Sequence, residues 1–137
     1  MLSTRSIDYI NRKLAGTHII LLNTAGIMET EAKVNAKWTD RTSHARQSIH
    51  SGVEGRGREL TLFLAHGVKY GAFLEEGTPP HIIRPKNKKA LYWKGAAHPV
   101  KQVNHPGTKA YPILEDTIKS NKNRLINDIA SWWANER

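Results

Sequence analysis

The chain has 137 residues, a net charge of +9 and a pI near 10.0. This length fits a single domain, residues 1–137. There is no cysteine, which excludes disulfides, thiolate metal ligands and cysteine nucleophiles. No run of about 18 apolar residues occurs, and the N-terminus lacks the charged-then-apolar order of a signal peptide. We therefore expect neither a transmembrane span nor a membrane partner.

The apolar residues of the first third predict a long helix. They recur at steps of three, four and seven residues, which places them on one helical face: Ile7, Ile10, Leu14, Leu21, Ala25, Met28 and Ala32. Ser6 is the expected N-cap of this helix. Gly16 is a candidate kink or break, because Gly weakens a helix by about 1 kcal/mol relative to Ala.

Residues 39–43 interrupt this period and predict a polar connection, in which Thr42 or Ser43 caps a short turn. Residues 49–53 and 60–65 follow as two predicted strands. The segment between them holds two glycines and two arginines, a composition that suits the tip of a β-hairpin.

Residues 68–76 form a short amphipathic segment in which Tyr70, Phe73 and Leu74 are expected to point inward. Gly77 is expected to supply a positive φ angle, and the two prolines after Thr78 must end the segment. Further short strands are predicted at residues 82–83, 91–93 and 100–103.

The C-terminal helix is expected to begin near Pro112, with Glu115 and Asp116 favourable to its positive end. Its predicted apolar stripe includes Ile113, Leu114, Thr117, Ile118, Leu125, Ile129 and one of Trp132 and Trp133. The whole pattern predicts an α+β domain. Long N- and C-terminal helices pack on a small antiparallel β-sheet, and a basic loop at about residues 77–91 projects from it.

Most of the positive charge lies in one stretch. Between Gly77 and Leu114 there is no Asp or Glu, whereas seven basic residues fall there: Arg84, Lys86, Lys88, Lys89, Lys94, Lys101 and Lys109. Three interpretations stay open for this tract: a solvated face, contacts to DNA phosphates, or docking on an acidic protein surface. Since lysine lacks the bidentate fork that reads bases, any DNA contact would be sequence-independent and salt-dependent.

Two motifs in the middle of the chain are its most specific features. The first reads Tyr-Gly-Ala-Phe-Leu-Glu-Glu-Gly-Thr over residues 70–78 and continues with Pro79-Pro80-His81 and a Pro-x-x-x-x-Ala-Leu step at residues 85–91. The second reads His-Pro-Gly-Thr-Lys-Ala-Tyr-Pro over residues 105–112. In this order the motifs resemble the head–tail joining, or tail-completion, family of long-tailed double-stranded DNA bacteriophages, also called neck or minor capsid proteins.

A looser match lies upstream, where the family often has Thr-Gly-x-Leu-Arg-x-Ser-Ile. Here residues 42–49 keep the Arg46 and Ser48-Ile49 of that step, but Ser43 and Ala45 replace its Gly and Leu. The resemblance implies a structural virion protein that assembles as a homo-oligomeric ring at the neck, between the head connector and the tail tube. Localisation to the virion neck, and to the host cytoplasm during assembly, follows from the same resemblance, which brings no catalytic residues.

The candidate site is therefore an assembly interface, and we expect no enzyme activity and no cofactor. Its candidate residues are Tyr70, Phe73, Leu74, Glu75, Glu76, Gly77, Thr78, His81, Trp132 and Trp133. Glu75 and Glu76 are adjacent, so they point about 100° apart on a helix and are expected to be exposed or interface carboxylates, not an acid–base couple.

His81, His98 and His105 have neither helical spacing nor a nearby carboxylate, and no metal site is expected. The adjacent tryptophans Trp132 and Trp133 cannot both face one narrow stripe. One of them lies at a subunit interface, or both pack on strands of the same monomer. The alternative function is a small basic protein that binds nucleic acid without sequence preference; a hydrolase or nuclease would need a constellation of carboxylates or histidines that the sequence lacks.

Overall fold

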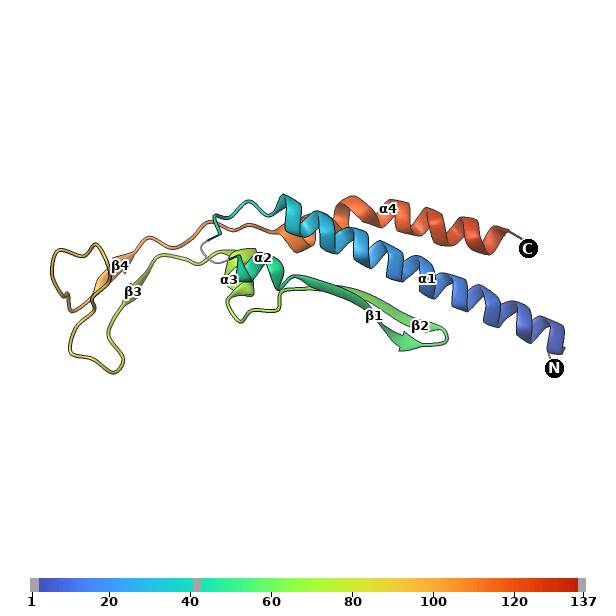
Figure 1. The fold of residues 1–137 in the computed structure, drawn as a ribbon, viewed down its shortest axis with the longest axis horizontal. Helices are drawn as coiled ribbons and strands as arrows, with labels where there is room; N and C mark the ends of the chain where they lie inside the picture. Colours follow the sequence, from blue (N-terminus) through green and yellow to red (C-terminus); the bar gives the residue numbers. More distant parts are fainter. Residues whose placement is uncertain (1–2, 41–42, 136–137) are drawn as a thin grey trace.

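The computed structural model describes residues 3–40 and 43–135. In these residues the helices are α1 (Thr4–Asn35), α2 (His44–Gln47), α3 (Gly71–Glu76) and α4 (Ile113–Ala134). The strands are β1 (His50–Arg56), β2 (Glu59–Ala65), β3 (His81–Ile83) and β4 (Val103–His105). Helices α1 and α4 lie side by side, the β1–β2 hairpin runs along α1, and β3 and β4 belong to an arm that extends away from them (Figure 1).

The predicted α+β class is confirmed, with long terminal helices packed on a small antiparallel hairpin. We call residues 78–110 the arm and the rest of the described chain the body. The projecting segment was expected to end at about residue 91, but the chain returns to the body only near residue 110 (Figure 1). The reason is that β3 and β4 pair with each other, so both halves of the excursion leave the body together.

Helix α1 begins earlier and runs straighter than its sequence predicts. Ser3, and not Ser6, is the N-cap, because the Ser3 Oγ accepts a hydrogen bond of 3.2 Å from the Ser6 N–H. No break occurs at Gly16. A Cβ atom there would collide with the indole of Trp132, so this glycine makes room on α1 for a side chain of α4.

The C-terminus of α1 is closed by Arg46 from the segment that follows it. The Arg46 guanidinium donates hydrogen bonds to the Lys33 carbonyl and, at 2.9 Å, to the Ala36 carbonyl. Its Nε lies 2.6 Å from Oδ2 of Asp40, whose Oδ1 accepts from the Trp38 indole at 3.1 Å. Arg46, one of the residues that agree with the upstream family step, thus satisfies carbonyls that a helix end leaves without partners.

The β1–β2 hairpin is longer than expected, with a shorter tip. The strands stay paired from His50↔Ala65 to Arg56↔Glu59, which leaves a two-residue turn at Gly57 and Arg58, with Gly57 at a φ of 63°. Ser43 occupies the N-cap position of α2 without a side-chain hydrogen bond; the alternative cap, Thr42, lies outside the described residues.

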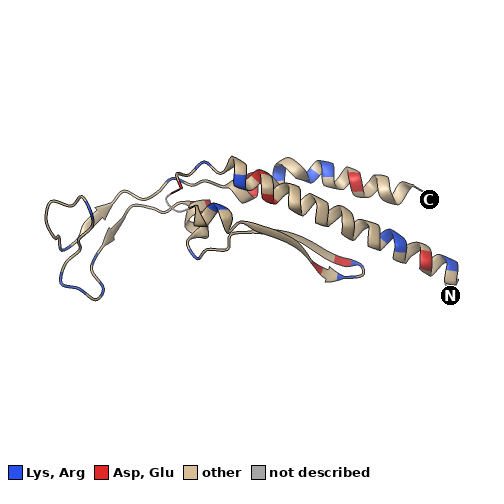
Figure 2. Ribbon diagram, in the orientation of Figure 1, with Lys and Arg blue, Asp and Glu red and all other residues tan. Residues whose placement is uncertain are grey.

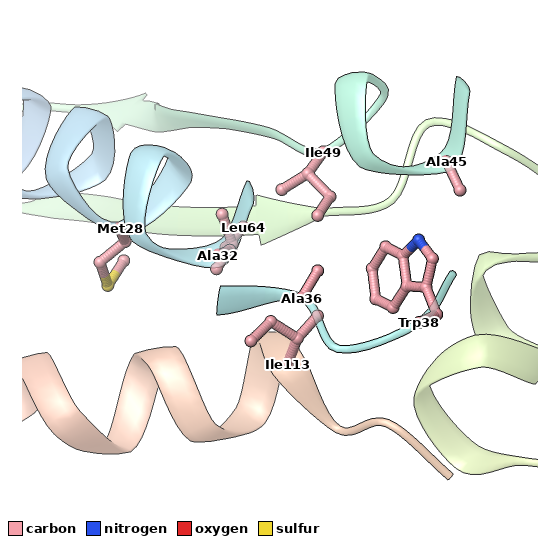
Figure 3. Close-up of a cluster of buried hydrophobic side chains, with 8 residues drawn as sticks. All are labelled: Met28, Ala32, Ala36, Trp38, Ala45, Ile49, Leu64 and Ile113. Atoms are coloured by element: carbon pink, nitrogen blue, oxygen red, sulfur yellow. The ribbon is translucent and has the colours of Figure 1, made fainter. Parts of the chain in front are cut away.

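The hydrophobic core lies at the end of the body nearest the arm. It collects buried side chains from α1, the connection after it, α2, the start of the hairpin, β2 and the first residue of α4 (Figure 3): Met28, Ala32, Ala36, Trp38, Ala45, Ile49, Leu64 and Ile113. The apolar stripe predicted for α1 is wrong at its start, because Ile7 is exposed. The N-terminal turns of α1 extend beyond the end of α4 (Figure 1).

A buried lysine of α1 binds the C-terminal end of α4. Lys13 of α1 is fully buried, and its Nζ donates to the Trp132 carbonyl at 2.5 Å and to the Asn135 carbonyl. The same Nζ lies 4.1 Å from the centroid of the Trp132 ring, a cation–π distance. A cation at the C-terminus of a helix is also favoured by the helix dipole.

We expect Lys13→Met to lower the free energy of unfolding by about 2 kcal/mol, because the C-terminal carbonyls of α4 lose a charged donor. Urea unfolding followed by tryptophan fluorescence measures this change. Lys37→Met is the matched control at an exposed position and should change stability by less than about 0.5 kcal/mol. Equal losses in the two variants would contradict the role of Lys13.

Candidate functional site

The two family-like motifs meet at the base of the arm. Thr78 and Thr108 form an antiparallel bridge in which each backbone N–H donates to the carbonyl of the other, at 3.1 and 3.0 Å. Their hydroxyls lie 3.0 Å apart. Thirty residues apart in the sequence, these threonines close the arm where it leaves the body.

Two glycines allow this close approach. Gly77 has a φ of 73°, which confirms the prediction of a positive φ, and a Cβ atom there would lie 2.6 Å from the Thr108 carbonyl oxygen. Gly107 has a φ of 86°, and its Cβ would lie 2.8 Å from the carbonyl carbon of Pro79. Each motif therefore contributes one glycine that makes room for the backbone of the other.

Beyond the base, His81 and His105 stand opposite each other in the β3–β4 pair. Their rings stack with centroids 4.9 Å apart and planes at 28°. His81 Nδ1 donates to the Pro79 carbonyl at 2.8 Å, and His105 Nδ1 accepts from the Gly107 N–H at 3.0 Å. Both imidazoles are thus oriented by the backbone of the arm itself. Nowhere in residues 3–40 and 43–135 do three or more His, Asp or Glu side chains gather as a metal site would require.

The short helix α3 presents its aromatic side chains to solvent. Tyr70 is 47% exposed and Phe73 60% exposed, so the prediction that they point inward is wrong; of the three, only Leu74 packs against the core. The inward position in α3 belongs to Gly71, because a Cβ there would collide with His66.

With the base of the arm, these aromatic side chains form an apolar groove of about 760 Å³. Its lining comes from α3, from both strands of the arm base and from the segment before α4: Tyr70, Phe73, Leu74, Thr78, Pro79, His81, His105, Thr108, Lys109 and Tyr111. Five of the predicted interface residues, Tyr70, Phe73, Leu74, Thr78 and His81, are therefore brought together on one concave surface.

Glu75 has a role that the sequence did not reveal. Its Oε1 and Oε2 accept hydrogen bonds, each of 3.1 Å, from the backbone N–H groups of Leu114 and Glu115. The expectation of an exposed or interface carboxylate is wrong for Glu75, which caps the N-terminus of α4 from another helix; Glu76 is exposed. A signal for such a cap was present, since Pro112 at the N-cap position has no side-chain oxygen to offer.

The buried side chain of His66 lies beside this cap. Its Nε2 is 3.6 Å from Oε1 of Glu75, and its ring packs against Trp38 with centroids 5.9 Å apart. The Tyr111 N–H also donates to the Leu74 carbonyl at 2.8 Å. The end of α3 and the start of α4 are thus joined at three backbone N–H groups.

The seven basic residues of the acid-free tract all lie on the surface of the arm. Figure 2 shows only basic colouring along it, and each of the seven predicted residues is exposed: Arg84, Lys86, Lys88, Lys89, Lys94, Lys101 and Lys109. The predicted strand at residues 91–93 is wrong, because only a bridge between Leu91 and Val100 forms there. Tyr92 and Trp93 are instead exposed between the lysines.

The two C-terminal tryptophans do not line the apolar groove at the base of the arm. They contact α1. The Trp132 indole N–H donates to the Lys13 carbonyl at 2.8 Å, and the Trp133 indole N–H donates to Thr17 Oγ1 at 2.9 Å. Both indoles therefore donate hydrogen bonds to helix α1 of their own chain, and Trp133 is still 38% exposed.

Comparison with known proteins identifies no relative of this chain. Neither the scan against protein-family models nor the searches of curated proteins and solved structures returned a significant match. Among the described helices, none has the length and apolar character needed to span a bilayer.

We expect Glu75→Ala to lower the free energy of unfolding by about 1–2 kcal/mol, because two N–H groups of α4 lose their cap. Glu76→Ala is the matched control one residue away and should cost less than about 0.5 kcal/mol. Urea titration of both variants measures the difference. Two variants of equal stability would show that the Glu75 carboxylate does not hold α4.

Proposed function

We propose that the chain is a structural virion subunit that joins head and tail in a long-tailed bacteriophage. Its copies form a ring at the neck, between the head connector and the tail tube. This proposal rests on the packing of two motifs at the base of the arm. The motifs that resemble the family, residues 70–78 and 105–112, pack on each other there through Thr78 and Thr108, as parts of one structural unit.

The shape of the chain supports a role in assembly. No residue of the arm is buried, and strand β3 is exposed along its whole length. Exposed apolar side chains rimmed by charge are typical of protein-interaction sites, and Ile82, Tyr92 and Trp93 provide them here. An arm of this kind gains most of its order when a partner covers it.

The charge distribution indicates that the partner of the arm is not another copy of the chain. The seven basic residues of the arm are among 21 Lys and Arg residues in the full sequence, so 14 remain outside the arm against 12 Asp and Glu residues. The chain outside the arm is therefore close to balanced in charge and offers no strong field to an arm from another copy. In the proposed neck, the arm engages an acidic face of the head connector or of the tail.

Shortening the arm tests the proposal. We replace residues 82–104 by Asn-Gly, which keeps the Thr78–Thr108 bridge and the stacked pair of His81 and His105 and closes the ribbon with a tight turn. The body should unfold at the same urea concentration as the unaltered chain, since the core lies outside the arm. In the phage that encodes the chain, filled heads and free tails should accumulate without joining, as seen by electron microscopy.

The matched control is the substitution of Lys37, Lys69 and Arg58, which lie in the body, by glutamine. This variant removes three positive charges but leaves the arm intact, and it should support joining. Normal joining of heads to tails by the short-armed chain would overturn the proposal.

The acid-free arm also favours the second candidate function, a nucleic-acid-binding protein outside any virion. Fluorescence anisotropy with a short labelled DNA duplex, repeated over a range of salt concentrations, separates the two. Under the assembly proposal the isolated chain does not bind the duplex at physiological salt, with a Kd above about 10⁻³ M, weaker than typical non-specific binding. A Kd on the order of 10⁻⁵ M or tighter that weakens steeply with salt would favour the second candidate.

A further inference from the structure

Helix α1 has an apolar face on the side turned away from α4 and the hairpin. Ile19 is 58% and Leu22 46% exposed, and Ile27 is exposed as well. Gly26 and Thr30 complete this surface, which we call the outer face of α1. A surface helix normally has charged or polar residues opposite its buried stripe, so this face has the composition of a helix that something covers.

Gly26 lies at the centre of the outer face, and nothing within the chain explains it. A Cβ atom at Gly16 would collide with Trp132, whereas a Cβ at Gly26 would have no atom within 4 Å. Together with Leu22, Asn23, Ile27 and Thr30, Gly26 lines a shallow depression. Since glycine weakens the middle of a helix, its presence there is accounted for when another backbone or side chain approaches closely.

A second helix face of the same chain matches this surface. Ile118 and Ile126 of α4 are exposed, although Ile118 was expected to face the core; Thr117 and Asn121 occupy the buried positions instead. The outer face of α4 comprises Ile118, Lys119, Lys122 and Ile126.

The charges at the edges of the two faces are complementary. On the α1 face, Glu29 is paired with Lys33 at 3.6 Å, whereas Glu31, which lines the depression, accepts a hydrogen bond of 2.7 Å from the neutral amide of Asn121. On the α4 face, Lys119 is paired with Glu115 at 2.7 Å, and Lys122 lies between Ile118 and Ile126 in a stretch, residues 117–127, that has no Asp or Glu. An apolar face with an acidic edge and an apolar face with a basic edge attract each other, whereas two copies of either face would bring like charges together.

We propose that a second copy of this chain packs the outer face of its α4 on the outer face of α1, with a side chain seated at Gly26. The inference rests on the proposed function, which requires copies of the chain to associate. Because the two contacting faces differ, the contact is heterologous, and repeated contacts of this kind close into a ring when the rotation permits.

The first test is Gly26→Leu in the full-length chain. Leucine fills the depression and blocks the contact, while it is a better helix former than glycine and has open space in the monomer. The variant should therefore melt about 3 °C higher as a monomer and lose the oligomers that the unaltered chain forms at high concentration, measured by multi-angle light scattering. Gly26→Ala is the control that gains helix stability with a smaller side chain.

The second test uses the absence of cysteine in the chain. A variant with Leu22→Cys and Ile126→Cys should give a ladder of disulfide-linked oligomers on oxidation, seen on a non-reducing gel. Each single substitution should give no dimer, and Leu22→Cys combined with Ile82→Cys on the arm should give no ladder.

Three results would overturn the contact: oligomers of unchanged size with Gly26→Leu, dimers from Leu22→Cys alone, or a chain that stays monomeric and uncross-linked at millimolar concentration. The proposed function is judged separately. Heads and tails that join with Gly26→Leu would refute the contact and leave the function standing, whereas joining by the short-armed chain would refute the function and leave the cross-linking result to decide the contact.

Discussion

The structure depends on charged side chains that close helix ends from elsewhere in the chain. The Glu75 carboxylate accepts from two N–H groups at the start of α4, and the Lys13 ammonium donates to carbonyls at its end. Each charge has the sign that the helix dipole favours at that end. Helix α4 is thus fixed at its N-terminus to α3 and at its C-terminus to α1. Arg46 does the same for the end of α1, so the long helices are held by their ends as well as by the core.

This fixing of helix ends explains how so small a core supports so long an excursion of the chain. Closing a long loop costs conformational entropy whatever its sequence, and the arm has little burial of its own to offset that cost. The cost is met at the base, where the Thr78–Thr108 bridge, the Leu74–Tyr111 hydrogen bond and the Glu75 cap lie side by side. Gly77 and Gly107 let the two backbones come close enough for this. The motifs that resemble the phage family therefore have a physical task, which is to hold the two ends of the arm together.

The sequence predicted what local patterns determine and missed what distant residues decide. Apolar periodicity and turn composition were sufficient for the two long helices, the hairpin and the positive φ of Gly77. They failed at Gly16, where Trp132 covers the helix, and at Glu75, whose partners lie 39 and 40 residues further along the chain. Tyr70 and Phe73 were placed inward because their spacing is amphipathic, yet His66 lies against Gly71 and turns the other face of α3 to the core. In each case a tertiary contact overrides the local pattern.

The arm and the outer face of α1 differ in charge, and this difference bears on how such a chain assembles. In a ring of the proposed kind, the apolar faces of α1 and α4 bring bodies together without electrostatic cost, since the charges at their edges are opposite and the bodies are nearly balanced in charge. The arms, each with seven basic residues and no acidic one, repel one another wherever they come within about 10 Å, the distance over which salt leaves charges unscreened. An anionic surface shared by all the arms removes that repulsion. Docking of the ring on such a surface then strengthens the contacts within the ring. Binding of the partner by the arms is thereby coupled to association of the bodies.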